Sequence, residues 1–275
     1  MSKQKKTNNK KHINKLMNDE LMRYNEQKEN NIFDFKNAFE NYQYLSNREK
    51  EEIEKKFSKP KNISQQKYVN ELNKQTNKIV ICIGPAGSGK SLFCTEIGIR
   101  NFLLGKYEKL IFTRPAVGAD EDLGYLPGTL EEKMAPYIRP IYDIIYRFIS
   151  PNELNFLISE KIIEIAPLSY MRGRTFKNSW IIADEMQNCS INQMKMLLTR
   201  IGQGSRMCIT GDLEQNDRKG EINGLQDFMD KFRIVRSDSI SSIEFDNNDI
   251  EREQVVKEVL KIYSGKNIPE EYGEC

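Results

Sequence analysis

Short apolar runs alternate with longer amphipathic segments between residues 78 and 210. The runs hold four to six residues, rich in isoleucine and other apolar side chains, as in strands that are covered on both faces. They occupy residues 78–83, 110–113, 162–166, 180–184 and 206–210. Because longer helical segments separate them, the pattern predicts an α/β fold, a mostly parallel sheet with helices on both faces.

Apolar residues at helical spacing predict the connecting elements. These are residues 90–104, 130–148, 153–159 and 190–200, with a closing amphipathic helix at 249–263. Ser190 and Gln193 form a capping-box pattern, which places a helix start at that point. Residues 64–72 are predicted to form a short helix that leads into the first strand.

The first 63 residues differ in composition from the rest. Residues 1–31 are rich in Asn, Lys and Gln and are predicted to be a basic, disordered tail. Its six lysines before Asp19 are either solvated or in contact with phosphates. Residues 32–63 are predicted to be a helical extension that ends at Pro60. We expect residues 64–275 to form one domain.

Composition removes several classes of protein. The chain has 275 residues and a net charge of +2, so it is not a strongly basic nucleic-acid binder. Its five cysteines form no C-x-x-C pair, which favours a reducing, cytoplasmic compartment. No apolar run approaches the roughly 18–20 residues of a membrane span, and we expect no membrane partner. The only histidine, His12, lies in the tail, which argues against histidine-dependent catalysis and histidine metal sites.

A glycine-rich segment, GPAGSGKS, follows the first predicted strand and opens a helix. It matches the phosphate-binding pattern G-x-x-x-x-G-K-[ST]. Glycines let the backbone N–H groups point inward at phosphate oxygens, and the helix start adds partial positive charge. Lys90 would reach the outer phosphates and Ser91 would supply a hydroxyl to Mg²⁺. The alternative is a glycine turn with a surface lysine. The cradle residues are Gly84, Pro85, Ala86, Gly87, Ser88, Gly89, Lys90 and Ser91.

Two further strands end in polar residues. SWIIADE ends in Asp184 and Glu185, which we assign to the Mg²⁺ shell and to water activation, respectively. An acid pair at a helix start is the alternative. MCITGDLEQND carries Gln215, whose amide could sense a γ-phosphate, although a solvent loop explains it equally well. Four arginines on polar segments that follow strands are suited to phosphate or to structural salt bridges. They are Arg114, Arg139, Arg172 and Arg174.

Several long motifs resemble the PhoH-like family of phosphate-starvation-inducible ATPases. They are the glycine-rich segment, TRPAVGADEDLGYLPGTLEEKMAPYIRPIYD, IEIAPLSYMRGRTFKNSWIIADEMQN and QMKMLLTRIGQGSRMCITGD, and the resemblance runs from about residue 64 to 263. It implies a RecA-like P-loop NTPase related to superfamily 1 helicases. Residues 84–91 would then be Walker A, residues 184–185 Walker B, 210–215 a motif III and 113–117 a motif Ia bordering single-stranded nucleic acid. Gln65, or Gln66 in another alignment, resembles the glutamine that holds adenine.

The resemblance implies a Mg²⁺-dependent ATPase that acts on ATP and is coupled to RNA or single-stranded DNA. One RecA-like domain suggests a homo-oligomer, in particular a hexameric ring, with an arginine reaching the neighbour's γ-phosphate. The candidates are Arg174 and Arg172, then Arg252, which matches a late family arginine, and Arg200. The departures are Met186 where the family often has alanine, and Glu253 where it has histidine. A slow nucleotide-dependent switch and a ribonuclease are the rival functions.

Overall fold

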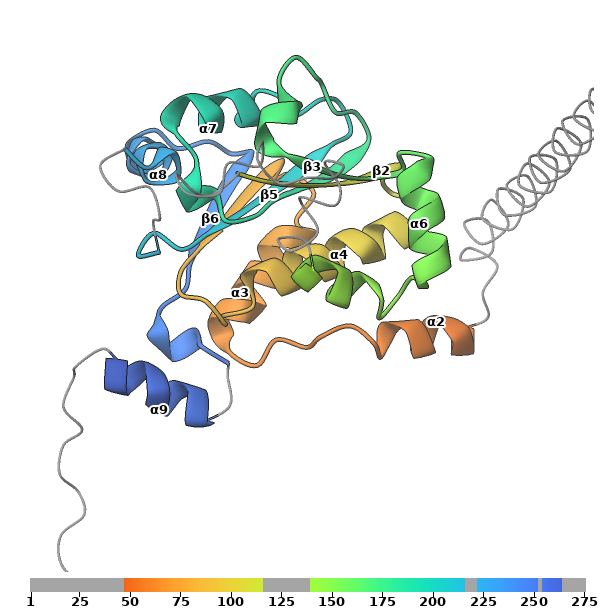
Figure 1. The fold of residues 1–275 in the computed structure, drawn as a ribbon, viewed down its shortest axis with the longest axis horizontal. Helices are drawn as coiled ribbons and strands as arrows, with labels where there is room; N and C mark the ends of the chain where they lie inside the picture. The colour runs from red at the N-terminus through yellow and green to blue at the C-terminus, as the bar shows by residue number, and fades with distance from the viewer. Residues whose placement is uncertain (1–46, 116–138, 216–221, 252–253, 264–275) are drawn as a thin grey trace, which may run out of the picture. The chain divides into compact units, whose positions relative to one another are not determined.

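The computed structural model describes residues 47–115, 139–215, 222–251 and 254–263 (Figure 1). The predicted tail, residues 32–46 of the predicted helical extension and Arg252 therefore lie outside the described residues. The chain divides into two compact units, Met1–Lys56 with Leu103–Gly105 and Phe57–Phe102 with Lys106–Cys275. Helix α2, Asn47–Glu54, belongs to the first unit. The elements that form the sheet and the candidate site belong to the second.

Six parallel strands form the sheet in the described ranges, in the order β3-β2-β4-β5-β1-β6. They are β1 Ile79–Ile83, β2 Lys109–Arg114, β3 Ile163–Pro167, β4 Ser179–Ala183, β5 Arg206–Gly211 and β6 Ile240–Glu244. The five predicted strands are confirmed within one or two residues. The sixth, β6, was missed because its ISSIE sequence neither alternates nor forms a continuous apolar run. It pairs with β1, so that Ile79 lies beside Ile240.

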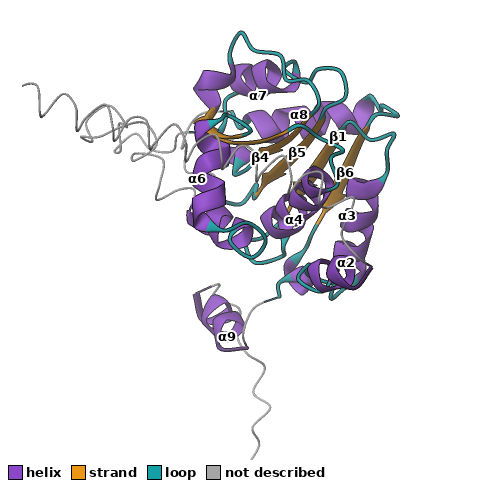
Figure 2. Ribbon diagram, turned by 90° about the vertical axis from the view of Figure 1, so that its right-hand side faces the viewer, coloured by secondary structure: helices purple, strands orange, loops and turns teal. Residues whose placement is uncertain are grey.

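Helices cover both faces of this sheet, as predicted (Figure 1 and Figure 2). The α-helices are α3 Ile63–Asn73, α4 Lys90–Leu103, α6 Pro151–Ser159, α7 Ile191–Leu198, α8 Gly224–Ile234 and α9 Gln254–Tyr263. Three short 3-10 turns are η1 Leu168–Met171, η2 Met186–Asn188 and η3 Asn247–Asp249. Residues 139–145 are also helical. No helix in the described ranges is both long enough and apolar enough to cross a bilayer.

Alternate side chains of the strands pack into two apolar layers, because successive residues of a strand face opposite ways. On one face, Ile81 and Ile209 join Met194, Leu225 and Met229 from α7 and α8. On the other, the indole N–H of Trp180 donates to the Cys94 carbonyl oxygen at 3.1 Å, and Trp180 is fully buried. A Cβ on Gly98 would lie 2.5 Å from the indole nitrogen, so α4 approaches the sheet only with glycine there.

The strand order brings three polar strand ends together. Strands β4, β5 and β1 are neighbours, and parallel strands all end at the same edge of a sheet. The glycine-rich segment after β1, the acid pair after β4 and the GDLEQ segment after β5 therefore meet at the middle of that edge. This is the α/β, RecA-like P-loop architecture predicted from the sequence.

Candidate nucleotide site

The glycine-rich segment forms a tight loop between β1 and α4. Gly84, Gly87 and Gly89 have φ angles of 142°, 86° and 93°, in the region that favours glycine. A Cβ on Gly84 would also lie 2.5 Å from the Phe245 carbonyl oxygen. The Ser88 hydroxyl donates to the Pro85 carbonyl oxygen at 2.8 Å and closes the loop on itself. These three glycines are needed for the backbone geometry that the phosphate-binding pattern requires.

Lys90 folds back over this loop. Its Nζ donates to the carbonyl oxygens of Gly84 and Pro85 at 2.7 and 2.8 Å, and only 9% of the residue is exposed. Burial lowers the pKa of Lys90, whereas the nearby carboxylates, including Asp212, act in the opposite direction. A buried ammonium held only by carbonyl oxygens is a strong donor for an incoming anion, because phosphate oxygens make stronger, charge-assisted hydrogen bonds.

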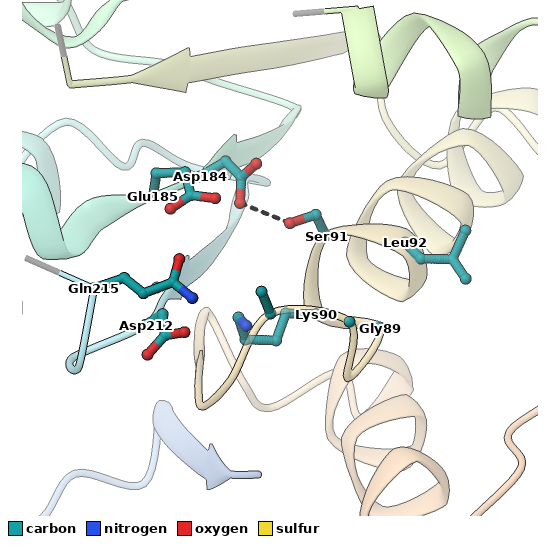
Figure 3. A pocket seen from close by; sticks show the side chains of 11 residues that line it. Gly89, Lys90, Ser91, Leu92, Asp184, Glu185, Asp212 and Gln215 are labelled. Carbon is teal, nitrogen blue, oxygen red and sulfur yellow. Dashed lines mark hydrogen bonds between the residues drawn. The ribbon is translucent and has the colours of Figure 1, made fainter. Parts of the chain in front are cut away.

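Ser91 and Asp184 form a pair of hard oxygen ligands (Figure 3). The Ser91 hydroxyl donates to Asp184 Oδ1 at 2.7 Å. The Thr210 hydroxyl, from β5, donates to the same oxygen and fixes the carboxylate. Mg²⁺ prefers oxygen ligands and is commonly held by one or two protein oxygens together with substrate phosphates. The donor set and its position beside the loop therefore fit Mg²⁺.

Glu185 is held in an unusual backbone conformation. Its φ of 54° is left-handed, a region that costs a non-glycine residue about 1–2 kcal/mol. Its carboxylate oxygen Oε2 accepts a 2.5 Å hydrogen bond from Gln187 Nε2, while Gln187 Oε1 accepts from the Asp212 backbone N–H at 3.0 Å. Gln187 is 1% exposed, so this bridge between the two loops is buried. Sequence reasoning assigned no role to Gln187, and it placed Asp212 only within the motif III resemblance.

One cavity of about 230 Å³ joins these groups. It is smaller than the roughly 300–1,000 Å³ of pockets that enclose a whole small ligand, and so it suits the phosphate end of a nucleotide. Figure 3 shows Asp184, Glu185, Asp212 and Gln215 on one side and Lys90 and Ser91 on the other. The residues that line it are Ala86, Gly87, Gly89, Lys90, Ser91, Leu92, Asp184, Glu185, Gly211, Asp212 and Gln215.

Gln65, on α3, contacts the phosphate loop. Its side-chain amide donates to the Ser88 carbonyl oxygen at 3.0 Å and accepts from the Lys61 backbone N–H at 2.8 Å. The residue is 3% exposed and does not line the cavity. Gln66, the other alignment, is exposed and donates to Asn70 Oδ1 at 3.0 Å. The structure thus shows Gln65 as a support of the phosphate loop, and its contact with adenine stays a prediction.

Arg172, Arg174 and Arg200 do not line this cavity. Arg174 forms a 2.6 Å ion pair with Glu164 and lies 4.6 Å above the Phe176 ring centroid. Arg200 donates to the Arg174 carbonyl oxygen at 3.1 Å. Arg172 is exposed and forms no ion pair with another described residue. Both Arg172 and Arg174 come after β3, the edge strand of the sheet, and after the short turn η1.

Comparisons with known proteins agree with this geometry. The sequence profile of the family described as "PhoH-like protein" matches residues 58–264. This chain belongs to the PhoH-like family. A PhoH-like protein of Bacillus subtilis (strain 168) is 41% identical over 230 residues, which cover 82% of this chain and 71% of that protein. A PhoH-like protein of Mycobacterium tuberculosis (strain ATCC 25618 / H37Rv) is 41% identical over 207 residues, 75% of this chain and 58% of that protein.

Protein PhoH of Escherichia coli (strain K12) is 36% identical over 193 residues, 69% of this chain and 54% of that protein. The PhoH-like chain thus spans little more than half the length of several curated relatives that it matches. Among solved structures, a Sulfolobus solfataricus SWI2/SNF2 ATPase core in complex with dsDNA matches 70% of this chain and 47% of that chain, with a TM-score of 0.42 and 11% identity.

Proposed function

We propose that this PhoH-like protein hydrolyses ATP with the help of Mg²⁺. The observation that carries the proposal is the convergence of three strand ends on one cavity. The loop after β1 contributes Lys90 and Ser91, the end of β4 contributes Asp184 and Glu185, and the loop after β5 contributes Gln215. A phosphate cradle, a pair of oxygen ligands for a metal and a carboxylate base are the parts that phosphoryl transfer to water requires.

Each residue has a definite role in that reaction. The loop N–H groups and Lys90 bind the β- and γ-phosphate oxygens, and Ser91 and Asp184 hold Mg²⁺, which neutralises phosphate charge when bound. Glu185 accepts the proton of the attacking water while Gln187 fixes its carboxylate. Gln215 hydrogen-bonds the γ-phosphate and so distinguishes the triphosphate from the product.

The test is phosphate release by purified protein with and without EDTA. Lys90→Ala should lose both nucleotide affinity and turnover. Glu185→Gln should bind ATP like the parent but hydrolyse it about 10²–10⁴-fold more slowly, because only the base is lost. Glu214→Gln is the matched control, since Glu214 is an exposed acid that does not line the cavity. Equal turnover by Glu185→Gln would exclude Glu185 as the base, and a very slow parent with tight ATP binding would favour the nucleotide-dependent switch.

We further propose that hydrolysis is coupled to single-stranded RNA or DNA. One support is the motif Ia resemblance at residues 113–117. The described part of this motif ends strand β2, which pairs with β4, the strand that leads to the acid pair. The other support is the lysine-rich segment of residues 1–16. Binding should weaken as salt rises, because phosphate contacts release counterions. Deletion of residues 1–16 should weaken it equally for different sequences. Binding that ignores salt, or turnover unchanged by RNA, single-stranded DNA and duplex DNA alike, would contradict this coupling.

A homo-oligomer, in particular a hexameric ring, would complete the site. The support is that Arg172 and Arg174 follow the edge strand β3 and do not line the cavity of their own chain. Arg172 is the better candidate of the two, because Arg174 is already paired with Glu164. Mixing inactive Lys90→Ala with Arg172→Ala should then restore part of the activity. No restoration with Arg172, Arg174, Arg200 or Arg252 variants, together with a monomeric mass in ATP, would refute the shared site.

A further inference from the structure

A second polar pocket lies at the opposite edge of the sheet from the phosphate loop. Lys78 immediately precedes β1 and Arg206 begins the neighbouring β5, and the Met207 N–H donates to the Lys78 carbonyl oxygen at 2.9 Å. The pocket, which we call the amino-edge pocket, has a volume of about 390 Å³. Because β1 has five residues, the pocket lies roughly 17 Å along the strand from the loop that follows it. The two sites are therefore separate.

The lining of the amino-edge pocket is cationic. Three of its side chains carry positive charge, Lys78, Lys106 and Arg206, and three are amides, Asn73, Gln75 and Asn101. No carboxylate is among its lining residues. The nearest acids in sequence already have partners: Glu71 Oε2 accepts from Asn77 Nδ2 at 2.6 Å, and Glu108 Oε1 accepts from Asn178 Nδ2 at 2.9 Å. These amides leave both carboxylates charged, but no described acid forms an ion pair with Lys78, Lys106 or Arg206.

Arg206 is the deepest of these cations, with 5% of its surface exposed. Its two terminal nitrogens donate to the carbonyl oxygens of Leu72 and Lys74, the second at 2.6 Å, so they satisfy the end of α3. Its Nε has no hydrogen-bond partner within the described residues, and none of them forms an ion pair with Arg206. Buried charges are usually paired with an opposite charge. A buried guanidinium without a carboxylate therefore leaves this pocket electropositive.

Tyr107 adds a flat wall. Its ring lies edge-to-face with Trp180, with the centroids 5.3 Å apart, and the residue is half-buried. Burial raises the pKa of Tyr107, which keeps the phenol protonated and able to donate a hydrogen bond. A flat ring with a donor at its tip suits a ligand that combines a phosphate with a sugar or a base.

We propose that the amino-edge pocket binds a phosphate group carried by a nucleotide or by a nucleic-acid backbone, at a site distinct from the P-loop. Lys78 and Lys106 would contact the phosphate from the exposed rim, Arg206 would supply buried positive charge, and the amides and Tyr107 would orient the rest of the ligand. A nucleotide and a nucleic-acid backbone both present phosphate groups, and the two labelled probes of the experiment below distinguish them.

The experiment uses the full chain with Lys90→Ala, which removes the main cation of the P-loop. Fluorescence polarisation is measured with a fluorescent ATP analogue and with a short 5′-phosphorylated, labelled single-stranded RNA. Lys78→Glu with Lys106→Glu should weaken binding of the true ligand by about tenfold or more, because two attractions become repulsions. The matched control is Lys67→Glu with Lys195→Glu, which changes the net charge equally at exposed positions outside the pocket.

The outcomes separate cleanly. A selective loss with the ATP analogue identifies a second nucleotide site, and a selective loss with RNA alone identifies a backbone contact. Equal effects of the pocket pair and the control pair, or residual binding that neither pair changes, would overturn the proposal. The four lysines are exposed, so thermal unfolding of both double variants should match that of the Lys90→Ala parent. This proposal does not depend on ATP hydrolysis at the phosphate loop, since the experiment measures only ligand binding.

Discussion

Gln187 should be a positioning residue for the proposed hydrolysis, and Gln187→Leu is the change that tests it. Leucine has a similar volume but can neither donate to Glu185 nor accept from the Asp212 N–H, the two hydrogen bonds that Gln187 makes. Because the side chain is 1% exposed, water does not readily replace either bond. The base would then lose its orientation, and the loop that carries Gln215 would lose its connection to the base.

The expected fall in kcat can be estimated from the hydrogen bond to the charged Glu185. A hydrogen bond to a charged group contributes about 1.5–3 kcal/mol net. If that energy holds Glu185 in its reactive position, kcat should fall about 10- to 150-fold, since 1.36 kcal/mol is tenfold in rate. Gln187 does not line the cavity and makes no contact with the phosphate loop among its described hydrogen bonds. The dissociation constant for an ATP analogue should therefore change little.

A stability control separates positioning from damage to the fold. Gln193 is another glutamine whose amide is bonded within the structure, because its Oε1 accepts from the Ser190 N–H at 2.9 Å in the capping box of α7. Gln193→Leu should lower the melting temperature with kcat unchanged. If Gln187→Leu lowers stability alone, or weakens ATP binding in parallel with kcat, the positioning role is wrong.

Three other predictions concern the same region. Gly98→Ala should lower the melting temperature despite alanine's better helix propensity, because the added Cβ would lie 2.5 Å from the Trp180 ring. Overpacking of this kind typically costs about 1–3 kcal/mol. An unchanged melting temperature would show that α4 can shift. Thr210→Val keeps the shape of the side chain but removes the hydroxyl that donates to Asp184, so the Mg²⁺ concentration needed for half-maximal activity should rise, measured by titration. Gln65→Leu should weaken the binding of ATP and GTP analogues alike, because the lost amide contacts the Ser88 carbonyl oxygen of the phosphate loop. A loss confined to the ATP analogue would support the predicted adenine contact.

The phosphate loop was predictable because its chemistry is local. Eight consecutive residues, 84–91, hold the glycines, the lysine and the serine, and the strand before them is a continuous apolar run. Asp184 and Glu185 were predictable for the same reason, since they end an apolar strand. The helix α8 was missed although its signal is strong: Leu225, Phe228, Met229 and Phe232 follow helical spacing. That helix was open to prediction, whereas β6 carries too weak a pattern.

Other functional features depend on contacts that no local pattern contains. Gln187 meets the Asp212 N–H across 25 residues of chain. Arg206 holds the end of α3 across 132 and 134 residues. Gln65 reaches the phosphate loop across 23 residues. Each contact exists only because strands β4, β5 and β1 are neighbours, or because α3 packs beside β1. The residues proposed to react could be identified from sequence motifs, whereas the residues that hold them in place could be identified only from the strand order.

The same strand order decides what a single chain can put into the site. The neighbouring strands β4, β5 and β1 bring the proposed base, the proposed metal ligands and the glycine-rich loop to one cavity. Strand β3 lies at the edge of the sheet, and none of the residues between it and β4 lines that cavity. In the proposed homo-oligomer, an arginine on that segment would contribute to catalysis at the cavity of another molecule. Arg172 is exposed, follows β3 and is not paired with a described acid. Its effect on turnover should accordingly depend on protein concentration, whereas the effect of Glu185→Gln should not.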